Sequence, residues 1–533
     1  MAATALTEVS TLLRDLRSLV DETRLVTELS EREAVSADVY SRGPTCLAVV
    51  RPQTPQQLAQ VVRQCVSAGC AVLPRGGGLT YSSGYMTDEA PGIVLDVSGL
   101  DRIVDLNPED MYITVEAGVT WKSIHEALRP HGLRLPCFGT FSGAAATVGG
   151  GLSSGALFFG TARYGTVADS LLGLEVALAD GQLMRTGQGG LRNVRKPAYR
   201  TYGPDLTGPF VHDCGVLGIK TQATFRLIRA PQHTGYASFA FETIEAASAA
   251  LSEVARAGLV EDAYVFDPAT TRNTFAGVDL RRGLRTVLQV AKSEDSVLRG
   301  TASAARLAWA GRRAPSLDSF SLHLVCAAHG PASLREDLEA CRKIAAERGG
   351  EELPDLVPRG ARATLFPPLN DILGANGDRW IALNAKVAHS EAGAVHAAVD
   401  RILSELAEPL KAAGVRTKRM MIAVSNHSFS YEPAFMWPDE WLPLHRRSPE
   451  PRHLATLSEP PVNLPAREII ATARQRIIDA FAALGAASNQ IGRAYPYGES
   501  LEPVTRHFLE QIKHAVDPRG LLNPGALGTH GCP

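Results

Sequence analysis

Apolar positions in this chain recur either as short unbroken runs or at helical spacing, and the two patterns alternate. The N-terminal stretch MAATALTEVSTLLRDLRSLVDE has the helical spacing, which predicts an amphipathic helix. Residues 56–67 are amphipathic and lead into the apolar run 71–74, which predicts a helix followed by a strand. The apolar run 171–179 ends at Asp180-Gly181 and predicts a strand, a tight turn and a second strand.

From about residue 231 onward the pattern favours longer strands and longer helices. Residues 239–257 predict a strand followed by an Ala-rich helix. Further strands are predicted at 263–267, 321–328 and 380–388, helices at 332–348, 392–413, 466–484 and 506–515, and an exposed loop at 447–465. Strands that alternate with amphipathic helices imply an α+β sheet with helices on one face. The basic segment 299–313 is interpreted as a solvated helix face rather than a docking patch.

Two glycine-rich segments stand out against this pattern. The first, Arg75 to Gly84, reads RGGGLTYSSG and follows the predicted strand 71–74. The second surrounds Thr147-Val148-Gly149-Gly150-Gly151 and has no charged residue before Arg163. Residues this small let the backbone approach a ligand, and successive amides can bind phosphate oxygens. Neither segment has the Rossmann or Walker A pattern, so each could also be an ordinary glycine-rich turn.

Several motifs in order resemble the flavin domain of the vanillyl-alcohol oxidase and para-cresol methylhydroxylase (PCMH-type) superfamily. They are PRGGGLTYSSG, VEAGVTWKSIHEAL, ATVGGGLSSGALFFGTARYGTVAD, GPDLTGPFVHDCGVLGIKTQATFRL and the tail VDPRGLLNPGALG. The resemblance implies FAD held in an extended form between two α+β subdomains, with an α+β substrate or cap domain, built on an antiparallel sheet, over the flavin ring. It also implies a homodimer.

The resemblance divides the chain into four parts. We expect an N-terminal helical arm at 1–43, a PCMH-type FAD-binding domain at 44–230, a substrate or cap domain at 231–500, and a segment at 501–533 that returns to the FAD-binding domain.

The resemblance also assigns residues to FAD, motif by motif. Along the pyrophosphate it places Arg75, Gly76, Gly77, Gly78, Leu79, Thr80, Tyr81 and Ser82; near the flavin ring or ribityl chain Pro136, Thr140, Ser142 and Gly143; in a second phosphate cradle Thr147, Gly150, Gly151, Ser153 and Ser154; near the adenine Gly165 and Val167; beside the adenine or the ring Gly215, Gly218 and Ile219; and in the tail Asn523.

Two clusters are candidates for the substrate side. Residues 426–437 are unusually aromatic, and strand alternation would put His427, Phe429 and Tyr431 on one face, either lining a pocket or as a core strand. The other cluster holds Arg493, Tyr495 and Tyr497. In the phenol-oxidising members of the superfamily a Tyr and an Arg hold the substrate phenolate, and an Arg beside phenols can stabilise an oxyanion. An Arg–Tyr packing pair is the structural alternative.

The chain lacks the histidine that several branches use to attach FAD covalently. Its first glycine loop continues Leu79-Thr80-Tyr81, so we expect FAD that is not covalently bound, although attachment at His427 or Tyr431 stays open. His389 and His396 have the spacing of a histidine pair found in metal-dependent hydroxy-acid members of the superfamily. No later His–Glu pair supports them, and we predict no metal site.

Composition agrees with an enzyme that is not tied to nucleic acid or membrane. The chain has 533 residues, a hydrophobic content of 45% and a formal net charge of −2, which gives no reason to expect nucleic-acid binding. No apolar run is long enough to span a membrane, and the N-terminus lacks a secretory pattern. The eight cysteines include no C-x-x-C motif. We therefore expect a cytoplasmic protein with free thiols.

The sequence thus predicts a FAD-dependent oxidoreductase that takes hydride from an aromatic alcohol or 4-alkylphenol to flavin N5. Arg493, Tyr495 and Tyr497 would polarise the substrate oxygen, with His427 or Tyr431 as a base or pocket residue. Oxygen or a redox protein would reoxidise the flavin. The segment RTGQGG resembles the phenol-oxidising branch. The alternatives are a D-2-hydroxy-acid (lactate- or glycolate-type) dehydrogenase in which Arg493 binds the carboxylate, and a flavin-binding module without turnover.

Overall fold

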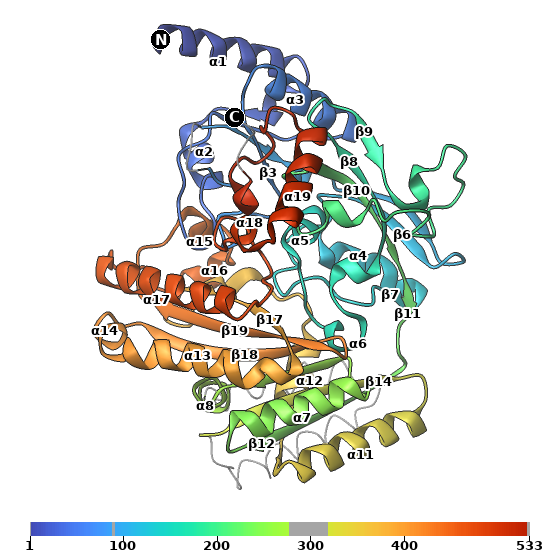
Figure 1. Cartoon of the computed structure of the whole chain (residues 1–533), viewed down its shortest axis with the longest axis vertical. Helices are drawn as coiled ribbons and strands as arrows, with labels where there is room; N and C mark the ends of the chain where they lie inside the picture. The colour runs from blue at the N-terminus through green and yellow to red at the C-terminus, as the bar shows by residue number, and fades with distance from the viewer. Residues whose placement is uncertain (1, 88–90, 277–317, 530–533) are drawn as a thin grey trace.

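The computed structural model describes residues 2–87, 91–276 and 318–529, and shows two lobes stacked along the long axis (Figure 1). The first lobe contains the small sheets formed by β1 to β11, and the second, which we call the cap, contains one large sheet formed by β12 to β19. The C-terminal helices α18 (Tyr497–Ser500) and α19 (Pro503–Val516) lie against the first lobe (Figure 1). The basic segment 299–313 lies outside the described residues.

A four-stranded sheet in the order β1-β2-β4-β3 carries the first glycine loop. Its strands are β1 (Leu25–Val26), β2 (Ala48–Val50), β3 (Val72–Arg75) and β4 (Ile93–Asp96), and the helices near it are α1 (Ala2–Arg17), α2 (Leu29–Val35) and α3 (Pro55–Ser67). Helix α3 begins where the Thr54 hydroxyl accepts a hydrogen bond from the Gln57 amide, and Pro55 stands in its first turn. Leu58 and Val62 lie on the inner face of α3 and are fully buried. The predicted helix followed by a strand is confirmed.

A five-stranded antiparallel sheet in the order β5-β6-β10-β8-β9 holds the rest of the first lobe. Its strands are β5 (Ile103–Asn107), β6 (Tyr112–Glu116), β8 (Leu171–Ala177), β9 (Leu183–Arg185) and β10 (Ile219–Arg226); β7 (Leu133–Arg134) pairs with β11 (Ile228–Arg229), and the helices are α4 (Trp121–Leu128), α5 (Val148–Ser154) and α6 (Thr161–Tyr164). Between β8 and β9, Gly181 has a φ of +81° and donates its amide to the Leu178 carbonyl. This tight turn confirms the predicted hairpin.

The cap is built on one eight-stranded antiparallel sheet in the order β15-β12-β14-β13-β18-β19-β16, with β17 beside β19. Its strands are β12 (His233–Phe241), β13 (Asp262–Phe266), β14 (Phe320–Ala328), β15 (Glu351–Leu353), β16 (Arg379–Ala382), β17 (Ala385–Ala388), β18 (Arg416–Val424) and β19 (Ser428–Trp437).

Helices α7, α11 and α13 cover one face of this sheet (Figure 1). The helices of the cap are α7 (Ile244–Arg256), α8 (Pro268–Ala276), α11 (Pro331–Glu347), α12 (Leu356–Ala363), α13 (Ala392–Glu405), α14 (Ala407–Ala412), α15 (Pro443–Arg447), α16 (Pro451–Leu454) and α17 (Leu464–Ala483). The other face is left for the first lobe, so the predicted α+β cap with an antiparallel sheet is confirmed.

Three elements differ in detail from the sequence prediction. The single strand expected at 380–388 is divided into β16 and β17, because the Asn384 amide donates to the Tyr495 hydroxyl oxygen at 2.9 Å and not to a strand partner. The helix expected at 392–413 is divided at Leu406 into α13 and α14. The loop expected at 447–465 contains the short helix α16.

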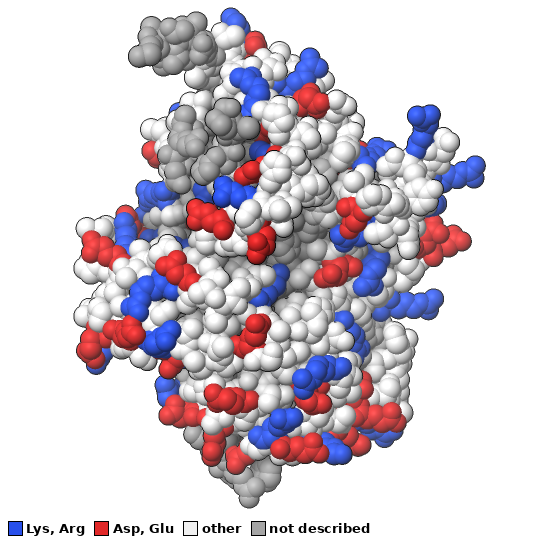
Figure 2. Space-filling model, viewed as in Figure 1, with Lys and Arg blue, Asp and Glu red and all other residues white. Residues whose placement is uncertain are grey.

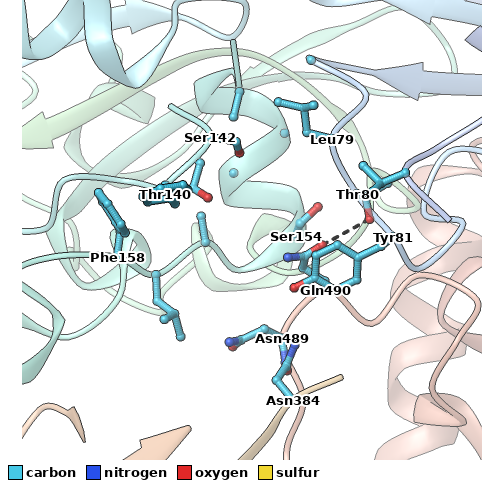
Figure 3. Close-up of a pocket in the computed structure, with 18 of the residues that line it drawn as sticks. Leu79, Thr80, Tyr81, Thr140, Ser142, Ser154, Phe158, Asn384, Asn489 and Gln490 are labelled. Atoms are coloured by element: carbon cyan, nitrogen blue, oxygen red, sulfur yellow. Dashed lines mark hydrogen bonds between the residues drawn. The ribbon is translucent and has the colours of Figure 1, made fainter. Parts of the chain in front are cut away.

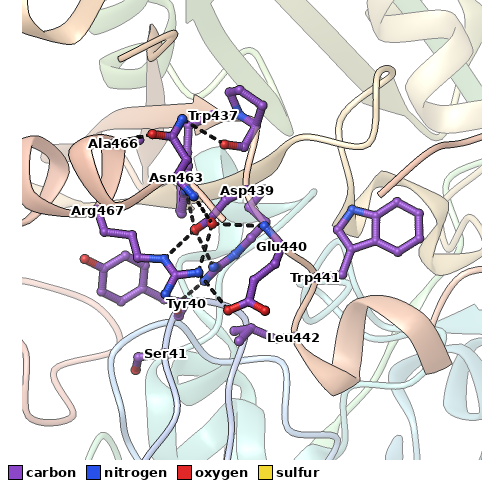
Figure 4. Close-up of polar contacts among 12 residues, drawn as sticks. Tyr40, Ser41, Trp437, Asp439, Glu440, Trp441, Leu442, Asn463, Ala466 and Arg467 are labelled. Carbon is purple, nitrogen blue, oxygen red and sulfur yellow. Dashed lines mark hydrogen bonds and ion pairs between the residues drawn. The ribbon is translucent and has the colours of Figure 1, made fainter. Parts of the chain in front are cut away.

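A buried carboxylate fixes the segment after β19 to the N-terminal arm. Asp439 is fully buried and accepts hydrogen bonds from Arg379 at 2.9 Å, Arg467 at 2.8 Å and the Trp437 indole at 3.1 Å (Figure 4). Arg379 also donates to the Tyr40 carbonyl. The arm, the cap sheet and α17 therefore meet at one charged centre.

Charged side chains of both signs are interspersed over the visible face of the molecule (Figure 2). This distribution agrees with the formal net charge of −2. Among the described helices, none is both long enough and apolar enough to cross a membrane.

Candidate active site

A cavity of about 770 Å³ lies between the glycine loops of the first lobe and the uncovered face of the cap sheet (Figure 3). This volume is within the usual range for a small-molecule or cofactor site. Both glycine loops contribute to its wall, and so do β13, β18 and β19 of the cap. The two segments singled out in the sequence therefore meet at one site.

The first glycine loop packs so closely on the second that side chains are excluded. A Cβ atom at Gly76 would lie 2.2 Å from the Thr147 hydroxyl, and one at Gly77 would lie 2.4 Å from the Ala145 carbonyl oxygen. Gly78 has a φ of +72°, a conformation that side chains disfavour. Gly76 and Gly77 are thus required by the contact between the two loops, and Gly78 by its backbone conformation.

The second loop adds a helix start to the same wall. Thr147 caps α5 by accepting a hydrogen bond from the Gly150 amide at 3.3 Å. Gly149 and Gly151 lie in the first turn of α5, and both line the cavity. The amides of this turn are used within the first lobe, since Gly149 donates to the Ala117 carbonyl at 2.8 Å and Gly151 to the Thr147 carbonyl at 2.9 Å. The turn therefore contributes a closely packed backbone surface to the wall.

Arg75 provides positive charge beside the first glycine loop. Its guanidinium donates to the Gly76 carbonyl at 3.2 Å and lies 3.9 Å from Asp96, and its Nε has no hydrogen-bond partner among the described residues. The glycine backbone of the first loop and an incompletely paired arginine suit the diphosphate of a dinucleotide. The residues present therefore fit FAD.

A short strap, Asn489-Gln490, joins the two loops across the cavity. The side-chain oxygen of Gln490 accepts a hydrogen bond from the Thr80 hydroxyl at 3.3 Å (Figure 3). The backbone N–H of Gln490 donates to the Ser154 carbonyl at 2.7 Å. Gln490 adopts a φ of +43°, which is uncommon for a residue with a side chain. The buried Oδ1 of Asn489 has no hydrogen-bond partner in the described structure.

The cap presents a largely apolar wall opposite the loops. Side chains alternate between the two faces of each strand, so every second residue of β13, β18 and β19 faces the cavity. On the cavity side lie Tyr264, Phe266, Trp380, Lys418, Met420, Ile422, Glu432, Ala434 and Met436. The Tyr264 hydroxyl is buried and has no hydrogen-bond partner in the described part of the chain. This wall suits an aromatic or apolar ligand, with a few polar groups left to orient it.

Glu432 places a carboxylate on this wall, as Asp262 of β13 also does. Burial raises its pKa above the ordinary value, and the nearby Lys418 ammonium acts in the opposite direction. The pKa of the Tyr81 phenol is raised well above its usual value, mainly by burial and further by the charge of Glu432. A carboxylate whose pKa is raised is a stronger base than an exposed one, which suits it to accept a proton from a substrate.

Most residues assigned to FAD from the sequence line the cavity. They are Arg75, Gly76, Gly77, Gly78, Leu79, Thr80, Tyr81, Ser82, Thr140, Ser142, Thr147, Gly150, Gly151, Ser153, Ser154, Gly215 and Ile219. The cavity wall does not include Pro136, Gly143, Gly165, Val167, Gly218 or Asn523. Asn523 supports the wall from behind, since its amide donates to the Gly84 carbonyl at 2.7 Å and the Cys214 carbonyl at 2.6 Å.

The structure does not bring Arg493, Tyr495 and Tyr497 to the cavity wall. Arg493 donates to the Ser83 carbonyl at 2.8 Å and to the Asn523 side chain at 3.1 Å, so it joins the first glycine loop to the C-terminal tail. The hydroxyl of Tyr495 is used by the Asn384 amide. The predicted oxyanion clamp is therefore a structural link behind the loops.

His427 and Tyr431 also lie away from the cavity. Tyr431 is fully buried on the helix-covered face of β19, and its hydroxyl lies 3.0 Å from Nδ1 of His396. His427 is exposed in the turn between β18 and β19. His389 lies 3.1 Å from the Asn426 carbonyl. Among the described residues, no group of three or more His, Cys, Asp or Glu side chains could hold a metal ion. Phe429 and Tyr431 do share a face, as predicted, but it is the face against the helices.

The sequence interpretation missed Lys418, Glu432 and Tyr264. The aromatic residues of β19 stand at odd-numbered positions, and these were predicted to face the substrate. The cavity is instead lined by the even-numbered positions Glu432, Ala434 and Met436. One sequence signal was available, because a glutamate within an otherwise aromatic and apolar strand is costly to bury without a function.

Comparisons with known proteins agree with this geometry. Residues 46–187 match the family described as FAD binding domain, which confirms the cofactor predicted from the sequence. The chain is 32% identical over 211 residues to "Probable D-lactate dehydrogenase, mitochondrial" of Danio rerio, covering 40% of this chain and 41% of that protein. It is 29% identical over 213 residues to "Glycolate oxidase subunit GlcD" of Bacillus subtilis (strain 168), covering 40% and 43%. The chain thus spans about two fifths of the length of these relatives.

The fold is similar over a longer span to a solved structure. p-Cresol methylhydroxylase with substrate bound superposes with a TM-score of 0.74 at 18% identity, covering 98% of this chain and 97% of the other. At this identity the likeness concerns the fold, and it extends through the cap as well as the first lobe.

Proposed function

We propose that this chain is a FAD-dependent oxidoreductase of the PCMH-type superfamily, which the match of residues 46–187 to a FAD binding domain and the similarity of fold both support. Its substrate class would be an aromatic alcohol or a 4-alkylphenol, oxidised at the carbon next to the ring. One observation carries this proposal: the cavity places phosphate-binding loops opposite an apolar, aromatic wall that contains a carboxylate.

The residues of the chain divide the chemistry between them. When bound, FAD supplies the hydride acceptor. Glu432 would accept the proton of the substrate hydroxyl as the C–H bond gives up its hydride, so that the alcohol loses both hydrogens and becomes a carbonyl. Phe266, Met420 and Met436 would hold the ring of the substrate and exclude water. Tyr264 offers a free hydroxyl to the substrate from the far end of the wall.

A second candidate is a D-2-hydroxy-acid dehydrogenase. It is supported by relatives that carry the names D-lactate dehydrogenase and glycolate oxidase subunit. In this case a carboxylate would adjoin the reacting hydroxyl, so the two groups would bind side by side on the wall.

The cofactor is proposed to be held without a covalent bond. The cavity-lining part of the first glycine loop contains no histidine, and His427 and Tyr431 lie away from the cavity. Acid precipitation of the holoprotein should release the yellow colour into the supernatant. Reoxidation by oxygen or a redox protein, a homodimer and a cytoplasmic location stay predictions from the sequence.

The decisive experiment is anaerobic mixing of the FAD-loaded protein with a substrate panel, followed by the flavin absorbance near ~450 nm. The panel contains 4-hydroxybenzyl alcohol, 4-ethylphenol, D-lactate and D-mandelate. Bleaching by the first two supports the aromatic-alcohol proposal. Bleaching by the hydroxy acids alone would replace it with the second candidate. Bleaching by dithionite but by no substrate would favour a flavin-binding module without turnover.

A further inference from the structure

The cap wall carries two opposite charges that do not pair with each other. Lys418 of β18 is opposite Ala434, and Glu432 of β19 is opposite Met420, so the two charged side chains occupy diagonal positions on the cavity face. Diagonal neighbours on adjacent strands are roughly 7–8 Å apart. Within the described residues, no ion pair shorter than 4.0 Å involves either side chain.

The surroundings of this pair are apolar. Met420 and Ala434 lie between or beside the two charges, Phe266 is opposite Met420 on the neighbouring strand, and Trp380 is opposite Met436. All four line the cavity. Charged groups that face an apolar cavity are costly unless a partner neutralises them. An ammonium and a carboxylate left apart in such a wall indicate a ligand that brings a matching group to each.

The spacing restricts what such a ligand can be. Lys418 requires an anionic group, and Glu432 requires a hydrogen-bond donor, such as the hydroxyl that reacts in the proposed function. Lys418 and Glu432 are offset by two residues along the strand direction, which corresponds to about 7 Å. An aromatic ring with an anionic oxygen at one end and a carbinol at the other spans this separation, whereas adjacent carboxylate and hydroxyl groups do not.

We propose that Lys418 is a specificity-determining binding residue for an anionic oxygen, phenolate or carboxylate, located across a ring from the reacting hydroxyl. This inference rests on the proposed function and names its substrate class as para-substituted benzylic alcohols that carry a negative charge. The ammonium of Lys418 binds the anionic oxygen, the apolar residues contact the ring, and the carbinol is directed to Glu432.

The test compares four alcohols that differ only in the group bound by Lys418. They are 4-hydroxybenzyl alcohol, 4-(hydroxymethyl)benzoate, neutral benzyl alcohol, and D-mandelate, whose carboxylate adjoins the carbinol. Lys418→Met should lower kcat/KM for one or both para-substituted substrates by roughly 10- to 100-fold, the worth of a hydrogen bond to a charged group. It should change benzyl alcohol by less than about threefold. The substrate that loses more identifies the source of the anionic oxygen.

Two further variants serve as controls. Lys418→Arg keeps the charge and should retain kcat/KM for the anionic substrates within about tenfold. Lys411→Met removes an exposed lysine of α14 and should change nothing. Equal losses on charged and neutral alcohols in Lys418→Met would overturn the inference, and so would a wild-type preference for D-mandelate over both para-substituted substrates.

A binding measurement separates this inference from the proposed function. 4-Methylbenzoate carries the anionic group but no reacting hydroxyl, and its binding can be followed by the change in flavin absorbance. If the wild type binds it and Lys418→Met binds it at least about tenfold more weakly, the anion site stands even if no alcohol is oxidised. If alcohols are oxidised but the variant binds 4-methylbenzoate as the wild type does, the anion site is wrong and the proposed function remains.

Discussion

Replacing Gly77 by alanine tests whether the contact between the two glycine loops creates the FAD site. The added Cβ would lie 2.4 Å from the Ala145 carbonyl oxygen and 3.2 Å from the Cα of Ala146, and both are backbone atoms that cannot rotate away. The loops must separate by about 1 Å to restore an ordinary contact, and overpacking of this kind costs about 1–3 kcal/mol. If this cost destabilises the loop arrangement that binds FAD, the Kd for FAD rises by roughly 5- to 150-fold.

The assay is a titration of the FAD-free protein with FAD, followed by the quenching of flavin fluorescence. Gly84→Ala is the matched control, because Gly84 also lines the cavity but its added Cβ would have no neighbour closer than 3.8 Å. We expect a change of less than about twofold for this control. A Gly77→Ala protein that is folded and binds FAD as tightly as the wild type would refute the argument that loop contact shapes the site.

Three further variants test other parts of the structure. Asp439→Ala leaves Arg379 and Arg467 without their shared buried acceptor and should lower the free energy of unfolding by about 3–5 kcal/mol in urea denaturation; a loss below about 1 kcal/mol would contradict the central role of this carboxylate. The pKa of Glu432 is raised above its ordinary value of 4.5, so turnover should increase with pH as the carboxylate forms above that value. In pH–rate profiles, Glu432→Gln should lose this pH dependence and most of the activity. Arg493→Ala should weaken FAD binding by about tenfold and leave kcat at saturating FAD within about threefold, since the guanidinium joins loop to tail; a hundredfold lower kcat would return it to the active site.

The flavin side of the molecule could be predicted because its chemistry is local in sequence. At Gly76, Gly77, Gly149 and Gly151 an added Cβ would lie less than 3.0 Å from a neighbouring residue, and these glycines come in two short runs of the sequence. The hairpin at Asp180-Gly181 was predictable for the same reason, since a left-handed glycine marks the turn. What could not be predicted is that Asn489 and Gln490 cross between the loops, because this contact joins residues about 400 positions apart.

The substrate side was predicted less well, because alternation along a strand shows which residues share a face but not which of the two faces lines the cavity. The aromatic residues of β19 suggested that Phe429 and Tyr431 face a pocket, but they pack under the helices, where large apolar side chains gain most from burial. Glu432 faces the cavity for the complementary reason, since a carboxylate is excluded from that core. No strand was predicted at 416–424 from the sequence, so the diagonal position of Lys418 and Glu432 across the hairpin of β18 and β19 was not predicted either.

The most direct test of the whole account is the anaerobic rate of flavin bleaching near ~450 nm with 4-hydroxybenzyl alcohol and its benzylic deuterated form. If the cavity binds FAD opposite a substrate whose benzylic hydrogen leaves as hydride, the protein bleaches with the ordinary alcohol and several times more slowly with the deuterated one. A FAD-loaded protein that is bleached by neither alcohol, or by both at the same rate at saturating substrate, would contradict hydride transfer from this substrate class in the cavity described.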